Sequence, residues 1–326
     1  MDIEFHYYIT YILSRMAGYS KNDAYTIAYS SQYTDDNTHR YYVNYEDGGH
    51  FLNEISQTMD ITKPSAKRQK IYPLFHFIPG GNEAEETCSF DCDDKKCFVT
   101  IPNSENANLL LKTAIESKDL YRIGIAVHAF ADTYSHQNFL GFKNKGNARN
   151  LVDLIPNIGH ADFRHEPDKV HNEWKDMRLG ENAAVVNNDD RFMEAAKQIF
   201  IHLYKSKNSQ SNDNDANAKF DELNLEIKLR EAMKESYWFG SDSKARVESY
   251  KKICQELGSE DYQYDSKKWR HAAVKKEKIE LDIFDRYWAT DDFEESDWYK
   301  FQSAVIDYRK YALDKFHDLY DKVGFI

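Results

Sequence analysis

The chain of 326 residues is long enough for one large domain or two small ones, and 23 Tyr, 19 Phe and 5 Trp supply ample material for a core. Its 13 Gly and 6 Pro are few, which favours long helices over a turn-rich β protein. The net charge of −12 argues against non-specific binding to nucleic acid or to an anionic membrane, because both need an excess of Lys and Arg.

The first 18 residues lack the features of a signal peptide. They have no basic start before the apolar run and no small-residue cleavage site. No uncharged run in the chain reaches transmembrane length. We therefore expect a cytoplasmic protein without a transmembrane segment, although export by a signal-independent route would leave the same sequence.

Three of the four cysteines lie close together in an acidic segment. Cys88, Cys92 and Cys97 have the spacing C-x3-C-x4-C, which is not that of a standard zinc knuckle. A loop disulfide and free thiols are both open, and we assign these cysteines no function.

The first expected helix runs from about residue 2 to 16 and ends at Gly18, a natural residue after a helix C-terminus. Asp2 and His6 are four residues apart and therefore share a helix face. Both are acceptable metal ligands. Near a chain terminus they are able to reach into a site from its edge.

A second helix is expected after Ser20, which starts a capping-box pattern with Asp23, and it ends near Asp35 and Asp36. Adjacent carboxylates at a helix end usually face solvent. Asp36 therefore becomes a ligand candidate only if other ligands converge on the same place. Further along, His76 lies between two Phe residues in a short apolar segment, where a lone histidine is more often a core residue than a ligand.

The segment Tyr121–Phe139 has the length and apolar content of a buried helix. It also carries His128, Asp132 and His136, and steps of four residues place all three on one face. Burial of two imidazoles and a carboxylate without partners would cost several kcal/mol. Two explanations are open: a hydrogen-bonded polar network between helices, and a divalent metal cluster, which the repeated spacing favours.

A second group of candidate ligands follows in a loop bounded by Gly and Pro. Five ligand-type residues fall within nine positions, a density typical of functional loops on rigid scaffolds. They are His160, Asp162, His165, Glu166 and Asp168.

From about residue 190 onward the pattern is helical, interrupted by a polar, low-complexity stretch at residues 208–217 that we interpret as a mobile loop. We find no convincing strand pairs. The sequence therefore predicts an all-α, multi-helix single domain over residues 1–326, with long loops. Residues 1–175 would form the metal-site core and residues 176–326 a C-terminal helical extension.

The order of ligand-type residues resembles that of the all-α family of zinc-dependent phospholipases C and single-strand-specific zinc nucleases. From the N-terminus it reads His6, Asp36, His76, then His128, Asp132 and His136 at steps of four, then His160 and an acidic residue. The N-terminal half is also similar to an uncharacterised bacterial family catalogued only as a domain of unknown function. That second likeness is carried by the phrases DIEFHYYITYILSRMAG, IAYSSQYTDD, FHFIPG and GIAVHAFADTYSHQNF.

The resemblance to the zinc enzymes implies two or three zinc ions, although His and carboxylate ligands accept other divalent metals as well. One ion would be bound by Asp36, His76, His128 and Asp132. Asp132 would bridge to a second ion, held by His6 and the N-terminal residue. The family uses the free amine of a processed Trp there, whereas this chain begins Met-Asp, so we expect Asp2 to substitute.

The third ion would be held by His136 and His160 with a carboxylate. The family pattern places an acid four residues after the last histidine, but Arg164 occupies that position. Asp162, His165, Glu166 and Asp168 remain as candidates, and we favour Asp168.

The resemblance implies an all-α fold of the zinc-dependent phospholipase C type and a metal-dependent phosphoesterase, with a phosphodiester substrate such as a phospholipid or nucleotide. Asp36 and Asp132 would be catalytic, the first by orienting a water and the second as a metal bridge. Arg164 would contact the substrate phosphate, unless it is simply a solvated arginine. Two other classes remain: a helical metal protein with a structural or sensing role, and a partner-binding helical protein whose histidines form core networks. The sequence does not indicate the oligomeric state.

Overall fold

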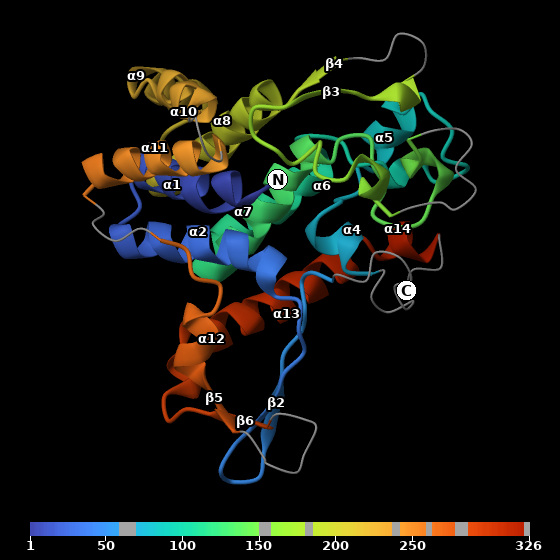
Figure 1. The fold of residues 1–326 in the computed structure, drawn as a ribbon. Helices are drawn as coiled ribbons and strands as arrows, with labels where there is room; N and C mark the ends of the chain where they lie inside the picture. Colours follow the sequence, from blue (N-terminus) through green and yellow to red (C-terminus); the bar gives the residue numbers. More distant parts are fainter. Residues whose placement is uncertain are drawn as a thin grey trace.

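The computed structural model describes residues 1–58, 70–149, 158–179, 185–236, 242–258, 263–277 and 286–322. Figure 1 shows a mostly helical body from which one small sheet projects. The helices of the N-terminal half are η1 (Glu4–Ile9, a π-helix), α1 (Thr10–Met16), α2 (Lys21–Asp36), α4 (Tyr72–Phe75), α5 (Asn82–Thr87), α6 (Glu105–Ser117) and α7 (Leu120–Ser135). Those of the C-terminal half are α8 (Asn188–Lys207), α9 (Asp213–Glu222), α10 (Leu225–Lys234), α11 (Asp242–Glu256), α12 (Lys268–Ala273), α13 (Asp297–Lys315) and α14 (His317–Asp321). Short 3-10 turns are η2 (Lys96–Phe98), η3 (Lys145–Asn147), η4 (Ala161–Phe163), η5 (Met177–Leu179) and η6 (Phe293–Glu295).

Two small sheets correct the all-α expectation. The projecting sheet has the order β2-β1-β6-β5 and is formed by β1 (Tyr42–Asn44), β2 (His50–Leu52), β5 (Val274–Glu277) and β6 (Arg286–Ala289). The other pairs β3 (Glu173–Lys175) with β4 (Val185–Asn187). Each strand has only three or four residues, too few for alternation to be read from sequence.

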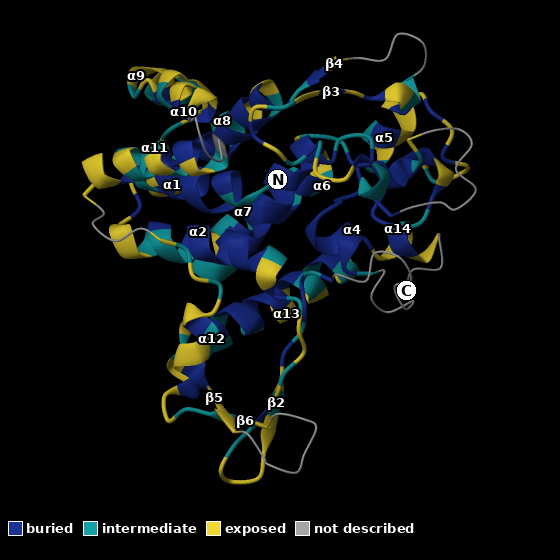
Figure 2. Ribbon diagram, in the orientation of Figure 1, coloured by how far each residue is buried: buried dark blue, intermediate teal, exposed yellow. Residues whose placement is uncertain are grey.

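Helix α7 lies at the centre of the body, packed against α2, α6, α8 and α13. Its first turn is capped by Asp119, whose carboxylate accepts the backbone N–H groups of Tyr121 and Arg122. Every residue from Ile123 to Ser135 is buried, as the dark colour of α7 in Figure 2 shows. The helix is therefore enclosed on all sides, and the polar residues His128 and Asp132 are buried with its apolar ones.

The closest approach to α7 is made by α2 at Gly124. A Cβ at this position would lie 2.4 Å from the Ile27 carbonyl oxygen and 2.4 Å from the Ser30 Cβ. Real contacts of this kind are essentially never so short, so glycine is what allows the two helices to touch. One turn further along each helix, the same approach brings the end of α2 beside His128.

Replacement of Gly124 by Ala should therefore reduce the free energy of unfolding by about 1–3 kcal/mol, the usual cost of overpacking a core. Helix propensity alone predicts the opposite, a gain of roughly 1 kcal/mol for Ala over Gly. Urea denaturation of the wild type and the Gly124→Ala variant distinguishes the two. A more stable variant would mean that α2 and α7 are not held in this close contact.

The C-terminal half shares the main core with the N-terminal half. Helix α8 packs against α1 and α7, α11 packs against η1, and α13 packs against α7. Phe5 and Phe192, for example, meet edge to face with ring centroids 5.8 Å apart. The predicted extension thus covers the N-terminal helices. Among the described residues, no helix is long and apolar enough to cross a membrane.

Only the first half of the polar stretch at residues 208–217 is a loop, since residues 213–217 belong to helix α9. Asn212 caps α9 by accepting the N–H of Asp215, and the Asp215 carboxylate accepts the N–H of Asn212 in return. This reciprocal capping box begins a helix at Asp213, because the same Asn and Asp residues that suggest disorder are also strong cap formers.

Candidate metal site

Helix α7 presents three of the predicted ligands on one face. His128 and Asp132 point from its last turns, and His136 is the residue that ends it. All three are buried, with 0%, 1% and 5% of their surface exposed, respectively. The predicted spacing of four residues therefore brings them together in an almost dry part of the molecule.

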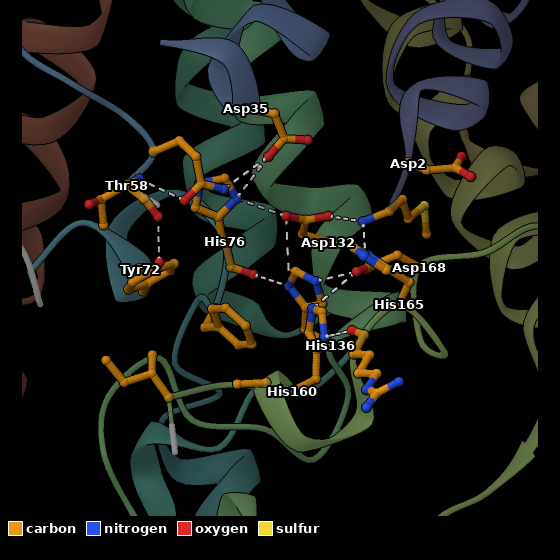
Figure 3. A pocket seen from close by; sticks show the side chains of 16 residues that line it. Asp2, Asp35, Thr58, Tyr72, His76, Asp132, His136, His160, His165 and Asp168 are labelled. Atoms are coloured by element: carbon orange, nitrogen blue, oxygen red, sulfur yellow. Dashed lines mark hydrogen bonds and ion pairs between the residues drawn. The ribbon is translucent and has the colours of Figure 1, made fainter. Parts of the chain in front are cut away.

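Four other segments converge on this face, as Figure 3 shows for part of the site. The π-helix η1 carries His6, the end of α2 carries Asp35, and the residue after α4 is His76. His160 directly precedes the turn η4, and Asp168 follows it. Among the described residues, three groups of side chains have the proximity needed to hold a metal ion: the His76 group (His76, His128, Asp132), the His6 group (His6, Asp35, His128) and the His136 group (His136, His160, Asp168).

The His76 group is the most compact. Asp132 Oδ2 lies 3.1 Å from His76 Nδ1 and 3.2 Å from His128 Nε2, and the two ring nitrogens are 3.0 Å apart. Nitrogen and oxygen ligands about 2.0–2.2 Å from a shared divalent ion lie about 3–3.5 Å from one another. The spacing of the three atoms therefore suits one shared cation.

The other two groups adjoin it. In the His6 group, Asp35 Oδ2 lies 4.0 Å from His6 Nε2, and Asp35 Oδ1 lies 3.8 Å from His128 Nε2. In the His136 group, the two carboxylate oxygens of Asp168 lie 3.1 Å from His136 Nε2 and 3.1 Å from His160 Nε2. Asp132 connects the His76 group to the His6 group, since its Oδ1 is also 3.2 Å from His6 Nε2.

Hydrogen bonds at the outer edge of the site fix the orientation of three imidazoles. The ring nitrogen of each that faces away from the carboxylates contacts a backbone carbonyl: His76 Nε2 contacts Ser56 O at 2.9 Å, His136 Nδ1 contacts His76 O at 2.7 Å, and His160 Nδ1 contacts Arg164 O at 2.7 Å. A carbonyl only accepts, so these nitrogens must donate their protons. In the neutral ring, the lone pair of the other nitrogen then faces the site, as in metal-bound histidines.

His6 and His128 lack comparable partners. Neither ring nitrogen of His6 has a hydrogen-bond partner of suitable geometry, and the same holds for His128 Nδ1. Both side chains are completely buried. A buried nitrogen without a hydrogen bond costs about 1–3 kcal/mol, so a metal ion bound by the lone pair of His6 would offset that cost.

The amino group of Met1 also enters the site. It donates to Asp132 Oδ1 at 2.5 Å and to Ser135 Oγ at 3.1 Å, and lies 3.2 Å from Asp168 Oδ1. Burial lowers the pKa of this amine, but attraction to Asp132, Asp168 and Asp35 outweighs burial and raises the pKa to about 11. The ammonium group thus occupies a point where the site favours positive charge.

Electrostatics favour neutral His6 beside ionised carboxylates. Burial, together with repulsion from His128 and the Met1 amine, lowers the pKa of His6 to about 3. Burial raises the pKa of Asp132, but the Met1 amine and the histidines outweigh it and hold the pKa well below its usual range. For Asp168 the same balance holds, and attraction to His160 is the largest of the causes that lower its pKa. A lone-pair donor next to anionic oxygens is the donor set that divalent transition metals prefer.

Two predicted ligands belong to none of the three groups. Asp36, at the end of α2, accepts the Tyr264 hydroxyl at 2.6 Å and turns away from the cluster, and Asp35 takes the expected place. The helix is therefore where the sequence predicts it, but the carboxylate that faces the cluster is that of Asp35, one residue before the predicted Asp36. The Asp2 carboxylate accepts the Glu4 N–H at 3.0 Å, and in Figure 3 the Asp2 side chain is directed away from His76. The Met1 amine lies beside Asp132, where the Asp2 carboxylate was expected.

The sequence of α2 does not separate Asp35 from Asp36. Steps of four from the buried Ile27 and Ser31 lead to Asp35, but the same steps from the buried Ala28 and Gln32 lead to Asp36. Of the four candidates left open beside His136 and His160, the structure places Asp168 against both rings. His165 lines the same cavity without joining a group.

A cavity of about 490 Å³ opens onto the cluster. Tyr72, Phe77 and Ile158 line one part of it, and Arg164 lies in its lining at an exposed position. Gln57 and Thr58, which no sequence pattern indicated, also line it, and Gln57 donates to Asp35 Oδ1 at 3.2 Å. Asp35, His160 and Asp168 are the partly exposed members of the three groups, with 26%, 18% and 17% of their side chains exposed.

The cysteines lie outside these groups. All four are free thiols, and Cys88 Sγ lies 3.8 Å from Cys92 Sγ without a bond between them. Of the two alternatives for the acidic segment, the structure has the free thiols.

Comparison with known proteins identifies a family but no function. No curated protein matches the chain, and no solved structure matches it. A family model described as "Family of unknown function (DUF6765)" matches residues 1–316, which extends the likeness from the N-terminal half to almost the whole chain. Nothing in these matches links the chain to the zinc-dependent phospholipases C or nucleases. The chain belongs to the DUF6765 family of unknown function.

Proposed function

We propose that this protein is a metal-dependent phosphoesterase whose site is the cluster of His and Asp residues around Asp132. The observation that carries the metal part is the set of three imidazoles that each donate one proton to a backbone carbonyl and turn the other nitrogen toward a carboxylate. A core polar network would have no need to leave both nitrogens of a buried His6 without hydrogen bonds.

The ligand set follows from the three groups. His76, His128 and Asp132 would hold one ion, and His136, His160 and Asp168 another. A third would lie between His6 and Asp35, with Asp132 shared and the Met1 amine close by. The sequence order of these ligands, and the helical scaffold that carries them, support a fold of the zinc-dependent phospholipase C type. Zinc is the proposed metal, since imidazole and carboxylate ligands suit it well.

The chemistry proposed for the site is hydrolysis of a phosphoester, most simply a phosphodiester of the phospholipid or nucleotide type. Clustered divalent ions, when bound, supply a water of lowered pKa and neutralise charge on the phosphate oxygens. Asp35 takes the role inferred for Asp36, because its carboxylate faces the cavity with 26% of its side chain exposed and can accept a proton from a water there. Arg164 at the cavity would contact the anionic group of the substrate. The rings of Tyr72 and Phe77 would limit the entry of bulk water.

The test is metal analysis combined with hydrolysis. Metal-stripped protein is reloaded with Zn²⁺ or Mn²⁺ and desalted, its metal content is measured by mass spectrometry, and activity is followed with bis-p-nitrophenyl phosphate and p-nitrophenyl phosphate. We expect stoichiometric metal and metal-dependent release of nitrophenol, faster from the diester. A natively folded protein that retains no metal would overturn the proposal. Metal retention without hydrolysis of either ester would instead favour a structural or sensing role.

A further inference from the structure

Glu4 and Arg246 form a buried ion pair between the two halves of the chain. Arg246 Nε donates to one carboxylate oxygen of Glu4 and its Nη2 donates to the other, both at 2.8 Å. Glu4 is completely buried and Arg246 is 8% exposed. Two parallel bonds between planar groups fix direction as well as distance.

This pair lies at the start of the segment that enters the metal site. Glu4 is the first residue of η1, three positions after the Met1 amine and two before His6. The segment is a π-helix, a rare form that usually occurs as a single turn and is frequent at functional sites. It therefore needs support from outside itself to keep both Met1 and His6 directed at Asp132.

Helix α11 supplies that support. It packs against η1, and Tyr250, one turn after Arg246, stacks against Tyr8 with ring centroids 6.2 Å apart. Neither Glu4 nor Arg246 is among the residues that line the cavity. Because the pair does not line the cavity, we expect it to act on the site mainly through the position of η1.

We propose that Arg246 is a positioning residue for the metal site, which holds the N-terminal turn through Glu4 so that the Met1 amine and His6 reach Asp132. This inference rests on the proposed metal function. It gives the C-terminal half a specific part in a site whose candidate ligands all lie in the first 168 residues.

The first measurement needs no metal. Protein that begins at Met1 is stripped of metal and treated briefly with an acetylating reagent, and acetylation of the N-terminal peptide is followed by mass spectrometry. In the wild type the amine is buried and paired, so it should react slowly. In Arg246→Met it should react at least tenfold faster, and in Arg246→Lys, which keeps the charge but loses the two parallel bonds, at an intermediate rate. Arg230→Met is the matched control, because it breaks the exposed ion pairs of Arg230 with Glu226 and Asp190 far along the chain from η1.

The second measurement is metal content. Arg246→Met should retain the ion of the His136 group but lose one equivalent from the groups that include His6 and His128. The double variant Glu4→Gln/Arg246→Met removes the unpaired buried charge, so it should regain thermal stability without regaining a protected amine or the lost metal. A purely structural pair would regain all three.

The outcomes separate the two proposals. Unchanged amine protection and unchanged metal content in both Arg246 variants would overturn the positioning role. If Arg246→Met fails to fold, the Lys variant and the double variant decide in its place. If the wild type binds no metal, the proposed function is overturned. If Arg246→Met is nevertheless acetylated faster than the wild type, Arg246 still positions the N-terminus.

Discussion

The Asp132→Asn variant is expected to lose most of its bound metal and to hydrolyse a phosphodiester about a thousandfold more slowly than the wild type, or slower still. Asp132 is the point where the site converges: one oxygen lies near Met1 and His6, and the other near His76 and His128. The substitution removes the charge but keeps the size of the side chain. Loss of a shared anionic ligand removes several kcal/mol of charge stabilisation, and each 1.36 kcal/mol corresponds to about a factor of ten in rate.

The metal-free variant should also be less stable than the metal-free wild type, because the buried Met1 ammonium loses its nearest anion. Removing one partner of a buried pair typically costs about 3–5 kcal/mol. Thermal unfolding of both metal-free proteins measures this difference. Asp162→Asn is the matched control: that carboxylate accepts the Arg149 N–H at 3.4 Å and belongs to none of the three metal groups. Equal metal content in the Asp132 and Asp162 variants would contradict the assignment of Asp132 as the shared ligand.

The central helix was predictable because two independent patterns agree there. Its apolar residues define a buried helix, and His128, Asp132 and His136 repeat every four positions within it. Such a repeat places side chains on one face whatever the surrounding fold. The expected convergence of His6 and His76 on that face came from the order of residues in a resembling family, and the structure brings both of them to it.

Other parts of the site depend on information that residue types do not carry. The Met1 amine belongs to the backbone, so a search of side chains for ligands passes over it and selects Asp2. Asp168 lies in a loop without a repeating pattern. That loop is fixed by packing, since Phe163 meets Phe139 and Trp174 with ring centroids 5.2 and 5.3 Å apart. Such contacts depend on tertiary structure.

The strands illustrate the same limit. Val43 pairs with Tyr287, and nothing near either residue in the sequence indicates the other. Long-range pairing of strands of three or four residues leaves no local signature, because one face of so short a strand holds only two side chains. Helices, whose hydrogen bonds are local, were therefore predicted far better than strands in this chain.

The pair Asp35 and Asp36 provides the sharpest test of the site, because the two carboxylates are adjacent and differ in direction. Asp35 is surrounded by His6, His76 and His128, which lower its pKa against the effect of burial. Burial raises the pKa of Asp36, which contacts Tyr264 instead. We expect Asp35→Asn to reduce metal affinity and hydrolysis by about a hundredfold or more, as loss of a ligand from a metal cluster should.

Asp36→Asn should leave metal content and activity within about twofold of the wild type and change stability by about 1 kcal/mol or less, the net value of one hydrogen bond. Titration of the metal-free proteins with Zn²⁺ by calorimetry, followed by the diester assay, measures both effects on one preparation. If Asp36→Asn were the damaging change, the last turn of α2 would have to be rotated by one residue, about 100°. Asp36 would then face the cluster. Gly124 meets Ile27, Ser30 and Ser31, all before that turn, so the Asp36 variant tests the end of α2 and Gly124→Ala tests the packing of its middle on α7.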